Sequence, residues 1–256
     1  MNNATSNEPN NVGNVAEKPA VILVHGAFSN SQVWGYVAGK LRAAGRHVVT
    51  VDLPGRAGAP MAADKVSLDL YRDTVVQALN NVSGPAILVG HSFAGIVIAA
   101  AAEQVPEKIK TLVFTAAYLP QDGDSLLSLA QQDHDARIGQ HLTIDKERGI
   151  AVVEYSARAE IFANDGTASL KEKLPDLILD EPATPLVTPV HVTAERFGRV
   201  DKIYVSTQVD QVISPAFQAQ MMSRTPVRKV VTLQTGHLPF LTDIEGMSLA
   251  IENATV

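Results

Sequence analysis

Short apolar runs alternate with amphipathic segments along most of the chain. Six runs are strand candidates, in residues 20–24, 47–51, 86–89, 111–115, 202–205 and 230–233. They carry few charges, as strands of a parallel sheet do when both faces of the sheet are covered. Between them, apolar residues recur at helical spacing in residues 33–41 and 68–79, and small apolar residues fill positions 96–102. This alternation predicts an α/β fold with a doubly wound, mainly parallel sheet of about six strands.

The pattern loosens between residues 118 and 199, where helical pieces are short and polar residues are frequent. Four prolines interrupt these pieces: Pro175, Pro182, Pro185 and Pro189. We interpret the stretch as a helical cap inserted after the fourth strand, over the carboxyl ends of the strands; a small second domain is the alternative. The expected organisation is a flexible N-terminal arm (residues 1–18), a core (residues 19–117 and 200–256) and a cap (residues 118–199).

Composition and charge argue against several classes of function for this protein. Of the 256 residues, 46% are hydrophobic and 19% charged, which is typical of a globular protein with a full core. The net charge of −6 argues against nucleic-acid binding, because no basic stripe is available to neutralise phosphates. The chain has no cysteine, so disulfides, thiolate metal sites and a cysteine nucleophile are excluded.

Two further observations concern membranes and targeting. No apolar run approaches the roughly 20 residues of a membrane-spanning helix. Residues 1–18 are rich in Asn, Ser, Glu and Pro and lack the apolar stretch of a signal peptide. We therefore expect a cytoplasmic protein; a periplasmic or secreted one is the alternative if a leader was removed.

The third apolar run is followed by a serine that has a glycine two positions before it and another three positions after it. Residues 86–89 lead into Gly90-His91-Ser92-Phe93-Ala94-Gly95, and the small-residue helix follows at once. A strand, a tight turn and a helix form the context of a nucleophile elbow, in which the serine has a strained backbone and an exposed hydroxyl. The alternative is a serine in an ordinary loop between strand and helix.

A serine nucleophile needs a base, and the base needs an orienting acid. Asp210 follows the strand candidate at residues 202–205, and His237 follows the last one, which matches the order Ser, acid, His of this architecture. Asp122 and Asp124 follow the fourth strand and are alternative acids, although Asp122-Gly123-Asp124 also resembles a solvated turn.

The reaction also needs donors for an oxyanion. The backbone N–H of Phe93, directly after the serine, is one candidate. The N–H of Ala27, in the loop after the first strand, is the other. His25 lies in the same loop, where a structural hydrogen-bonding role is expected rather than catalysis.

These segments resemble the α/β-hydrolase fold, and within it the plant methylesterase and hydroxynitrile lyase family with its bacterial carboxylesterase relatives. The matching segments are residues 24–27 with Trp34, residues 52–55, 88–95 and 202–205, and Asp210 with Pro215 and Phe217. The resemblance covers nearly the whole chain after residue 18, is weakest in the cap, and favours Asp210 over Asp122 as the acid. In the plant lyases a threonine follows the first strand's histidine and a lysine follows the catalytic histidine. Gly26 and Leu238 stand at these positions here, so the resemblance implies hydrolysis rather than cyanide release.

The sequence therefore predicts a serine carboxylic-ester hydrolase that acts on a small to medium ester. Ser92, His237 and Asp210 are the expected triad, and the Ala27 and Phe93 amides the expected oxyanion donors. Phe28, Tyr118, Leu119 and Leu238 are candidate pocket residues, with core packing as their alternative role. We expect no cofactor, no metal and no nucleic-acid partner, and a monomer or homodimer. The alternatives are hydroxynitrile lyase chemistry and a non-catalytic small-ligand receptor.

Overall fold

The computed structural model describes residues 18–255, and its main feature is a sheet of six parallel strands. Their order is β2-β1-β3-β4-β8-β9. The strands are β1 (Val21–Val24), β2 (Val48–Val51), β3 (Ala86–His91), β4 (Ile109–Thr115), β8 (Lys202–Thr207) and β9 (Lys229–Leu233). The predicted α/β fold with about six parallel strands is confirmed.

The strand order reverses between β1 and β3. The chain runs from β1 to β2 on one side and then returns to place β3 on the other, so that Val24 pairs with both Val51 and Gly90. In sheets of this kind, ligands bind at the carboxyl ends of the strands, where the order reverses. The loops that begin at His25 and Ser92 leave the sheet at this point.

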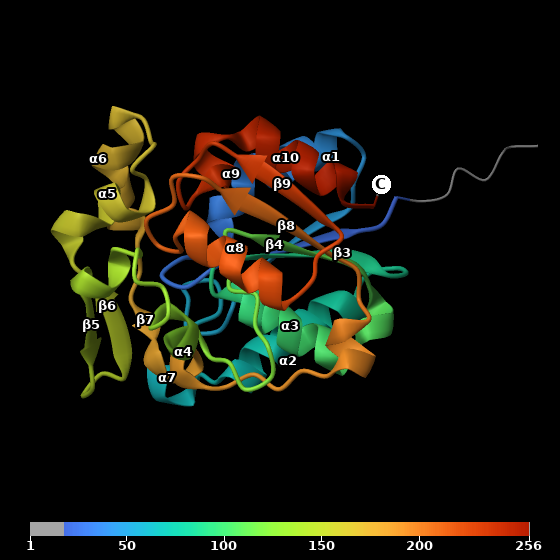
Figure 1. The fold of residues 1–256 in the computed structure, drawn as a ribbon, viewed down its shortest axis with the longest axis horizontal. Coiled ribbons are helices and arrows are strands. Elements are labelled where there is room, and N and C mark those ends of the chain that lie inside the picture. The colour runs from blue at the N-terminus through green and yellow to red at the C-terminus, as the bar shows by residue number, and fades with distance from the viewer. Residues whose placement is uncertain (1–17, 256) are drawn as a thin grey trace, which may run out of the picture.

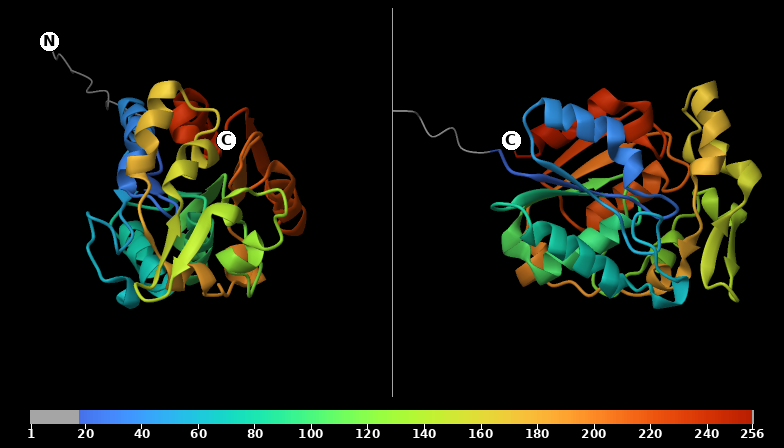
Figure 2. Two further views of the ribbon diagram at one scale, coloured as in Figure 1. Left: turned by 90° about the vertical axis from the view of Figure 1, so that its left-hand side faces the viewer. Right: turned by 180° about the vertical axis from the view of Figure 1, so that it is seen from behind.

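Helices cover both faces of the sheet. Figures 1 and 2 show α1 and α10 on one face and α2 and α3 on the other. The helices of the core are α1 (Gly35–Ala43), α2 (Leu68–Asn80), α3 (Ala94–Gln104), α8 (Pro215–Arg224), α9 (Pro239–Thr242) and α10 (Ile244–Glu252). Several begin at a side-chain cap; Ser67, for example, accepts a hydrogen bond from the N–H of Leu70 at 3.1 Å.

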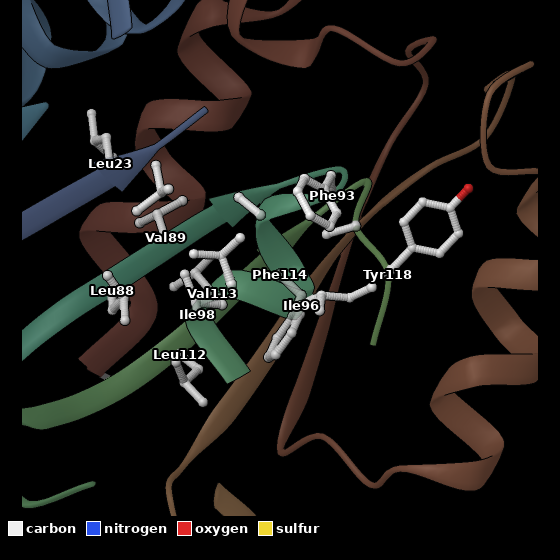
Figure 3. Packing of buried hydrophobic residues seen from close by; sticks show 14 of the residues in the cluster. Leu23, Leu88, Val89, Phe93, Ile96, Ile98, Leu112, Val113, Phe114 and Tyr118 are labelled. Atoms are coloured by element: carbon white, nitrogen blue, oxygen red, sulfur yellow. The ribbon is translucent and has the colours of Figure 1, made fainter. Parts of the chain in front are cut away.

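One part of the hydrophobic core lies between the central strands and α3. All six residues of β3 are buried, and residues 94–102 of α3 are buried on every side. Figure 3 shows Leu88 and Val89 of β3 packed among Leu23 of β1 and Ile98 of α3. The small residues of α3 allow this close approach, which holds the turn between β3 and α3 rigidly in place.

The stretch interpreted from the sequence as a cap, residues 118–199, is not purely helical, and we keep the name cap for these residues. It contains α4 (Leu126–Ala130), α5 (Arg158–Phe162), α6 (Ala168–Leu177) and α7 (Ala183–Val187). It also contains a three-stranded antiparallel sheet of β5 (Leu142–Asp145), β6 (Ile150–Val153) and β7 (Glu181–Pro182). Strands this short show little alternation of apolar and polar residues. The sequence therefore predicted a helical cap and did not predict this sheet. Figure 1 shows α5, α6, β5 and β6 together at one end of the main sheet.

Two sequence-based predictions concern features beyond this core. The predicted N-terminal arm lies outside the described residues, apart from Lys18. Within residues 18–255, none of the helices has the length and apolar character needed to cross a membrane.

Candidate active site

Ser92 lies in a tight turn between β3 and α3. Its backbone φ is 53°, in the left-handed region that residues other than glycine rarely adopt. Three hydrogen bonds hold its peptide groups. The Ser92 N–H donates to Thr115 O at 3.2 Å, and Ser92 O accepts the N–H groups of Tyr118 at 3.2 Å and Gly95 at 3.0 Å. The sequence predicted this strained backbone, which is a mark of functional turns.

The glycines around Ser92 differ from the usual elbow pattern Gly-x-Ser-x-Gly. Ala94 occupies the position of the second glycine, and the glycine comes one residue later. A Cβ atom on Gly95 would lie 2.0 Å from the carbonyl oxygen of Tyr118. A Cβ atom on Gly90 would lie 2.8 Å from the carbonyl oxygen of Ala94. Both glycines are therefore required by close backbone contacts.

His237 and Asp210 form a buried pair. The Nδ1 atom of His237 lies 2.9 Å from Oδ2 of Asp210, and their side chains are 1% and 0% exposed. Because a carboxylate can only accept, Nδ1 carries the proton and Nε2 is left with a free lone pair. Among the described residues, Nε2 has no other hydrogen-bond partner, so it can serve as a base.

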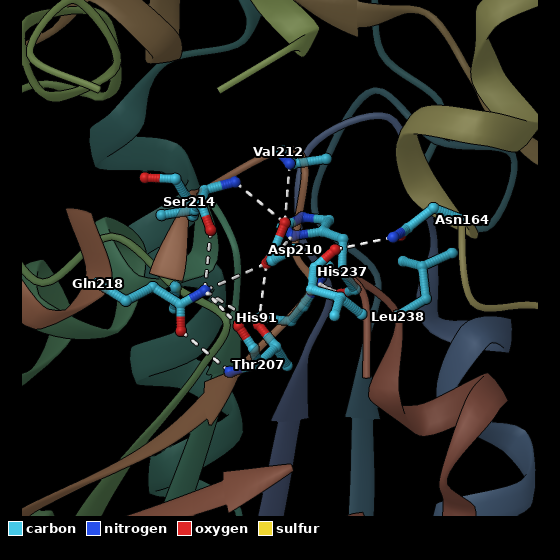
Figure 4. A network of polar contacts seen from close by, with 12 residues as sticks. His91, Asn164, Thr207, Asp210, Val212, Ser214, Gln218, His237 and Leu238 are labelled. Atoms are coloured by element: carbon cyan, nitrogen blue, oxygen red, sulfur yellow. Dashed lines mark hydrogen bonds and ion pairs between the residues drawn. The ribbon is translucent and has the colours of Figure 1, made fainter. Parts of the chain in front are cut away.

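The Asp210 carboxylate is surrounded by donors. Its Oδ1 accepts the backbone N–H groups of Val212 at 2.8 Å and Ile213 at 3.0 Å. Its Oδ2 accepts the Thr207 hydroxyl at 3.0 Å, with the Gln218 amide at 3.4 Å. Figure 4 shows these contacts around the pair. Four donors from the protein stabilise the negative charge and fix the carboxylate against the imidazole.

His91 holds the backbone of His237. Its Nε2 lies 2.9 Å from the carbonyl oxygen of His237, and the two rings lie 4.6 Å apart. The ring of Phe240 meets His91 edge-on at 4.8 Å. The residue before Ser92 thus links the serine turn to the loop of the histidine.

The loop after β1 lies directly against Ser92. A Cβ atom on Gly26 would come within 2.8 Å of both Ser92 Cβ and His91 Nδ1. Among the described residues, neither the N–H of Ala27 nor that of Phe93 has a hydrogen-bond partner. Two free donors therefore lie in the two loops that flank Ser92, as an oxyanion hole requires.

A cavity of about 320 Å³ opens beside Ser92. From the core it is lined by Ala27, Phe28, Ser92 and Val212, and from the cap mainly by Tyr118, Leu126, Leu127, Ala130, Ile138, Leu142, Phe162 and Leu186. Its wall is largely apolar, and no lysine or arginine of the described chain lines it. Its size lies at the lower end of the range for small-molecule sites.

The sequence and the fold were compared with those of known proteins. The model of the alpha/beta hydrolase family matches residues 21–247. The chain belongs to this family. It is 28% identical over 243 residues to methyl jasmonate esterase 1 of Vitis vinifera, covering 86% of this chain and 90% of the relative. It is 26% identical over 240 residues to a pyrethroid hydrolase of Sphingobium wenxiniae, covering 90% of this chain and 85% of the relative.

Solved structures share the fold. A pyrethroid hydrolase structure superposes with a TM-score of 0.81 at 25% identity, covering 91% of this chain and 96% of the other. Polyneuridine aldehyde esterase superposes with a TM-score of 0.82 at 18% identity, covering 93% of this chain and 100% of the other. The resemblance to the α/β hydrolases and their plant methylesterase branch is confirmed.

Not every predicted site residue of this α/β hydrolase lies at the cavity. Phe28 and Tyr118 line it, but Leu119 does not: it is buried, and its N–H lies 3.3 Å from Met221 Sδ. Leu238 lines a separate space of about 40 Å³ behind Ala27. The residue after His237 therefore does not line the larger cavity.

The alternative acids lie away from His237, Asp122 exposed and Asp124 partly buried. Asp122 accepts the N–H of Val192 at 3.1 Å and lies 3.2 Å from His191 Nδ1. Asp124 accepts the N–H of Gln121 at 2.9 Å. Neither contacts His237, so the geometry favours Asp210, in line with the resemblance.

The sequence analysis missed most of the cap's contribution. Phe162 lines the cavity and lies 6.0 Å from the His237 ring. Asn164 donates to the carbonyl oxygen of Val209 at 2.8 Å, next to the Asp210 loop. Asp133 accepts the N–H of Ser214 at 2.7 Å and its hydroxyl at 2.6 Å, at the start of α8. No local sequence signal marked these residues, because each contact joins parts of the chain that are 45 to 81 positions apart.

His25 has the structural role that the sequence suggested. Its Nδ1 donates to the carbonyl oxygen of Gly26 at 2.8 Å, and its Nε2 accepts the N–H of Leu53 at 3.1 Å. Burial, with the Arg56 cation as a second cause, lowers the pKa of His25 to about 3. Burial also lowers the pKa of His91 well below its ordinary value. Both imidazoles are therefore neutral in the folded protein at neutral pH.

We expect these two histidines to make the protein acid-sensitive. In the unfolded chain each takes up a proton near pH 6.5, whereas in the folded chain each stays neutral to far lower pH. The unfolded state then binds more protons, so stability falls as the pH drops from about 6.5 towards 3. Between pH 6 and pH 5, the two groups together should lower the free energy of unfolding by about 2 kcal/mol. Urea unfolding at both pH values measures this; equal stabilities would contradict it.

A second prediction concerns Gly95. Gly95→Ala places a carbon against the Tyr118 carbonyl, and neither backbone can move without disturbing Ser92. We expect a loss of at least about 2 kcal/mol in the free energy of unfolding. Gly39→Ala is the matched control, since Gly39 lies in α1 with open space around its Cα. That change should raise stability by about 0.5–1 kcal/mol. Similar stabilities for the two variants would show that the close contact is absent.

Proposed function

We propose that the protein is a serine carboxylic-ester hydrolase that acts on a small to medium, neutral ester. The observation that carries this proposal is the buried His237–Asp210 pair, which leaves a basic Nε2 at the edge of the sheet where the Ser92 turn also lies. The names of the relatives support it, since they are a methyl jasmonate esterase, several methylesterases and a pyrethroid hydrolase.

In the proposed first half-reaction, Ser92 Oγ attacks the ester carbonyl carbon while His237 Nε2 takes the hydroxyl proton. Asp210 keeps the imidazole in the required tautomer and stabilises the imidazolium that forms. The carbonyl oxygen becomes an oxyanion and accepts hydrogen bonds from the Ala27 and Phe93 amides. Collapse of this intermediate breaks the bond to the leaving alkoxide, which takes the proton from His237, and an acyl-enzyme remains.

In the second half-reaction a water molecule attacks the acyl carbon. His237 removes the proton of the water, the same amides bind the new oxyanion, and the proton then returns to Ser92 as the acid leaves. The chemistry uses only groups of this chain, and the water is the only co-reactant.

The cavity suggests the class of substrate. An apolar wall favours aliphatic or aromatic groups, and the absence of a cation from the lining disfavours an acid with a second carboxylate. Asp133 adds a negative charge at the same wall. A neutral ester of modest size fits these properties.

Cyanohydrin cleavage is less well supported. A cation next to the base would be needed to stabilise departing cyanide, and Leu238 supplies none. At Gly26, where the plant lyases have a threonine, a Cβ atom would lie only 2.8 Å from both Ser92 Cβ and His91 Nδ1. Release of cyanide from mandelonitrile by the wild type would contradict this choice.

The first experiment is hydrolysis of p-nitrophenyl butyrate by the wild type and by Ser92→Ala. The wild type should turn over, and the variant should lose about 10⁶ in kcat because the nucleophile is gone. A wild type that binds the ester but does not hydrolyse it would favour a receptor. A variant that keeps most of the rate would overturn the role of Ser92.

The choice of acid can be tested separately. Asp210→Asn keeps the shape but stabilises the wrong imidazole tautomer, so kcat should fall about 10³–10⁴-fold. Asp122→Asn is the matched control on the surface and should leave kcat within about twofold of the wild type. Equal losses in the two variants, or none in either, would remove Asp210 from the triad.

A further inference from the structure

Glu181 is a fully buried carboxylate that reaches from the cap into the core. It lies on β7, and its Oε2 atom is 2.5 Å from Nη2 of Arg56. Both side chains are completely inaccessible to solvent. Its other oxygen, Oε1, accepts the hydroxyl of Tyr71 on α2 at 3.1 Å. Three separate parts of the chain therefore meet at one carboxylate.

A pair of this kind is not explained by stability alone. Removing two charges from water costs several kcal/mol for each, and well-packed apolar residues often serve the fold as well or better. The proposed ester hydrolysis does not use the charge of Glu181 directly either. The informative feature is the third partner of the carboxylate, which is part of the oxyanion loop.

That third partner is the backbone of Phe28. Its N–H donates to Oε2 of Glu181 at 2.7 Å. Its carbonyl oxygen accepts the N–H of Leu179, two residues before Glu181, at 2.8 Å. The same cap segment thus holds both polar groups of Phe28, whose φ of 60° is in the left-handed region. This fixes the peptide plane that follows Ala27, which is joined through the Ala27 Cα to the plane that carries the Ala27 N–H.

The cluster also touches the second oxyanion donor. The ring of Tyr71 packs edge-on against the ring of Phe93, with centroids 6.1 Å apart. The guanidinium of Arg56 lies over the Tyr71 ring at 5.8 Å and donates through Nε to the carbonyl oxygen of Ser29 at 2.8 Å. Burial, with the Glu181 charge as a second cause, raises the pKa of Tyr71, which keeps its hydroxyl a donor.

We propose that Glu181, together with Arg56 and Tyr71, is a positioning device that sets the oxyanion hole from the cap side. The inference rests on the proposed esterase function for its catalytic consequence. None of the three residues touches the reacting atoms. They act through the peptide of Phe28 and the ring of Phe93, and so hold the two donor amides at a fixed separation. A donor misplaced by about 1 Å can cost about 10²-fold in rate.

Two matched double variants separate positioning from stability. Arg56→Met with Glu181→Gln removes both charges but keeps a side-chain carbonyl that can accept the Phe28 N–H. Arg56→Met with Glu181→Met removes both charges and the acceptor. Neither variant leaves an unpaired buried charge, and both lose the same Arg56 contacts, so they differ only at the end of the side chain at position 181.

Two readouts are compared between these variants. We expect the Met variant to have a kcat for p-nitrophenyl butyrate about 10- to 100-fold below that of the Gln variant, with KM within about threefold. Amide hydrogen exchange in residues 25–30 should be at least about tenfold faster in the Met variant. Equal exchange would show that Glu181 does not hold the loop, and faster exchange with equal kcat would show that its hold has no catalytic effect.

Tyr71→Phe provides a milder variant that keeps the ring contact with Phe93. It removes one donor to Glu181, and we expect kcat to fall about threefold or more with KM little changed. An unchanged kcat would argue against the device. If the wild type itself hydrolyses no ester, the proposed function fails, and the exchange measurement still decides whether Glu181 holds the loop.

Discussion

At Gly95, helix α3 touches the chain that leaves β4 so closely that one added carbon would lie 2.0 Å from the Tyr118 carbonyl oxygen. This contact forces a tight turn between β3 and α3, and the tight turn gives Ser92 its left-handed backbone. The same chain segment returns a hydrogen bond from the Tyr118 N–H to Ser92 O. The position of the serine therefore follows from backbone packing in the core, and the side chains of the site are arranged around it.

The cap is attached by hydrogen bonds to the loop after β1, to the loop after β8 and to the start of α8. Glu181 binds the Phe28 N–H in the loop after β1. Asn164 binds the carbonyl oxygen of Val209 beside the acid, and Asp133 binds Ser214 at the start of α8, the helix that carries Gln218. The contacts of Glu181 and Asp133 are buried, and buried polar groups are costly to leave unsatisfied, whereas the contact of Asn164 is exposed. A cap held in this way has a structural influence on the loops of the proposed oxyanion donor and of the proposed acid, in addition to forming part of the wall of the cavity.

The core could be predicted from the sequence because its signals are local. Apolar runs mark the strands, Ser67 marks a helix start, and glycines on both sides of Ser92 mark the turn. The order Ser92, Asp210, His237 then follows from the sheet, since residues after parallel strands meet at one edge. The cap could not be predicted in the same way. Its short strands have no clear periodicity, and Glu181 looks like an ordinary surface carboxylate until Arg56 and Phe28 are seen beside it, 125 and 153 positions away in the chain.

The central claim is that Ser92 is a nucleophile activated by His237. Treating the wild type with a small p-nitrophenyl phosphonate, followed by peptide mass spectrometry, tests it most directly. The account predicts one phosphonyl group per chain, attached to Ser92, and a rate of labelling that drops by orders of magnitude in His237→Ala. Labelling at another residue, or equally fast labelling without His237, would contradict it.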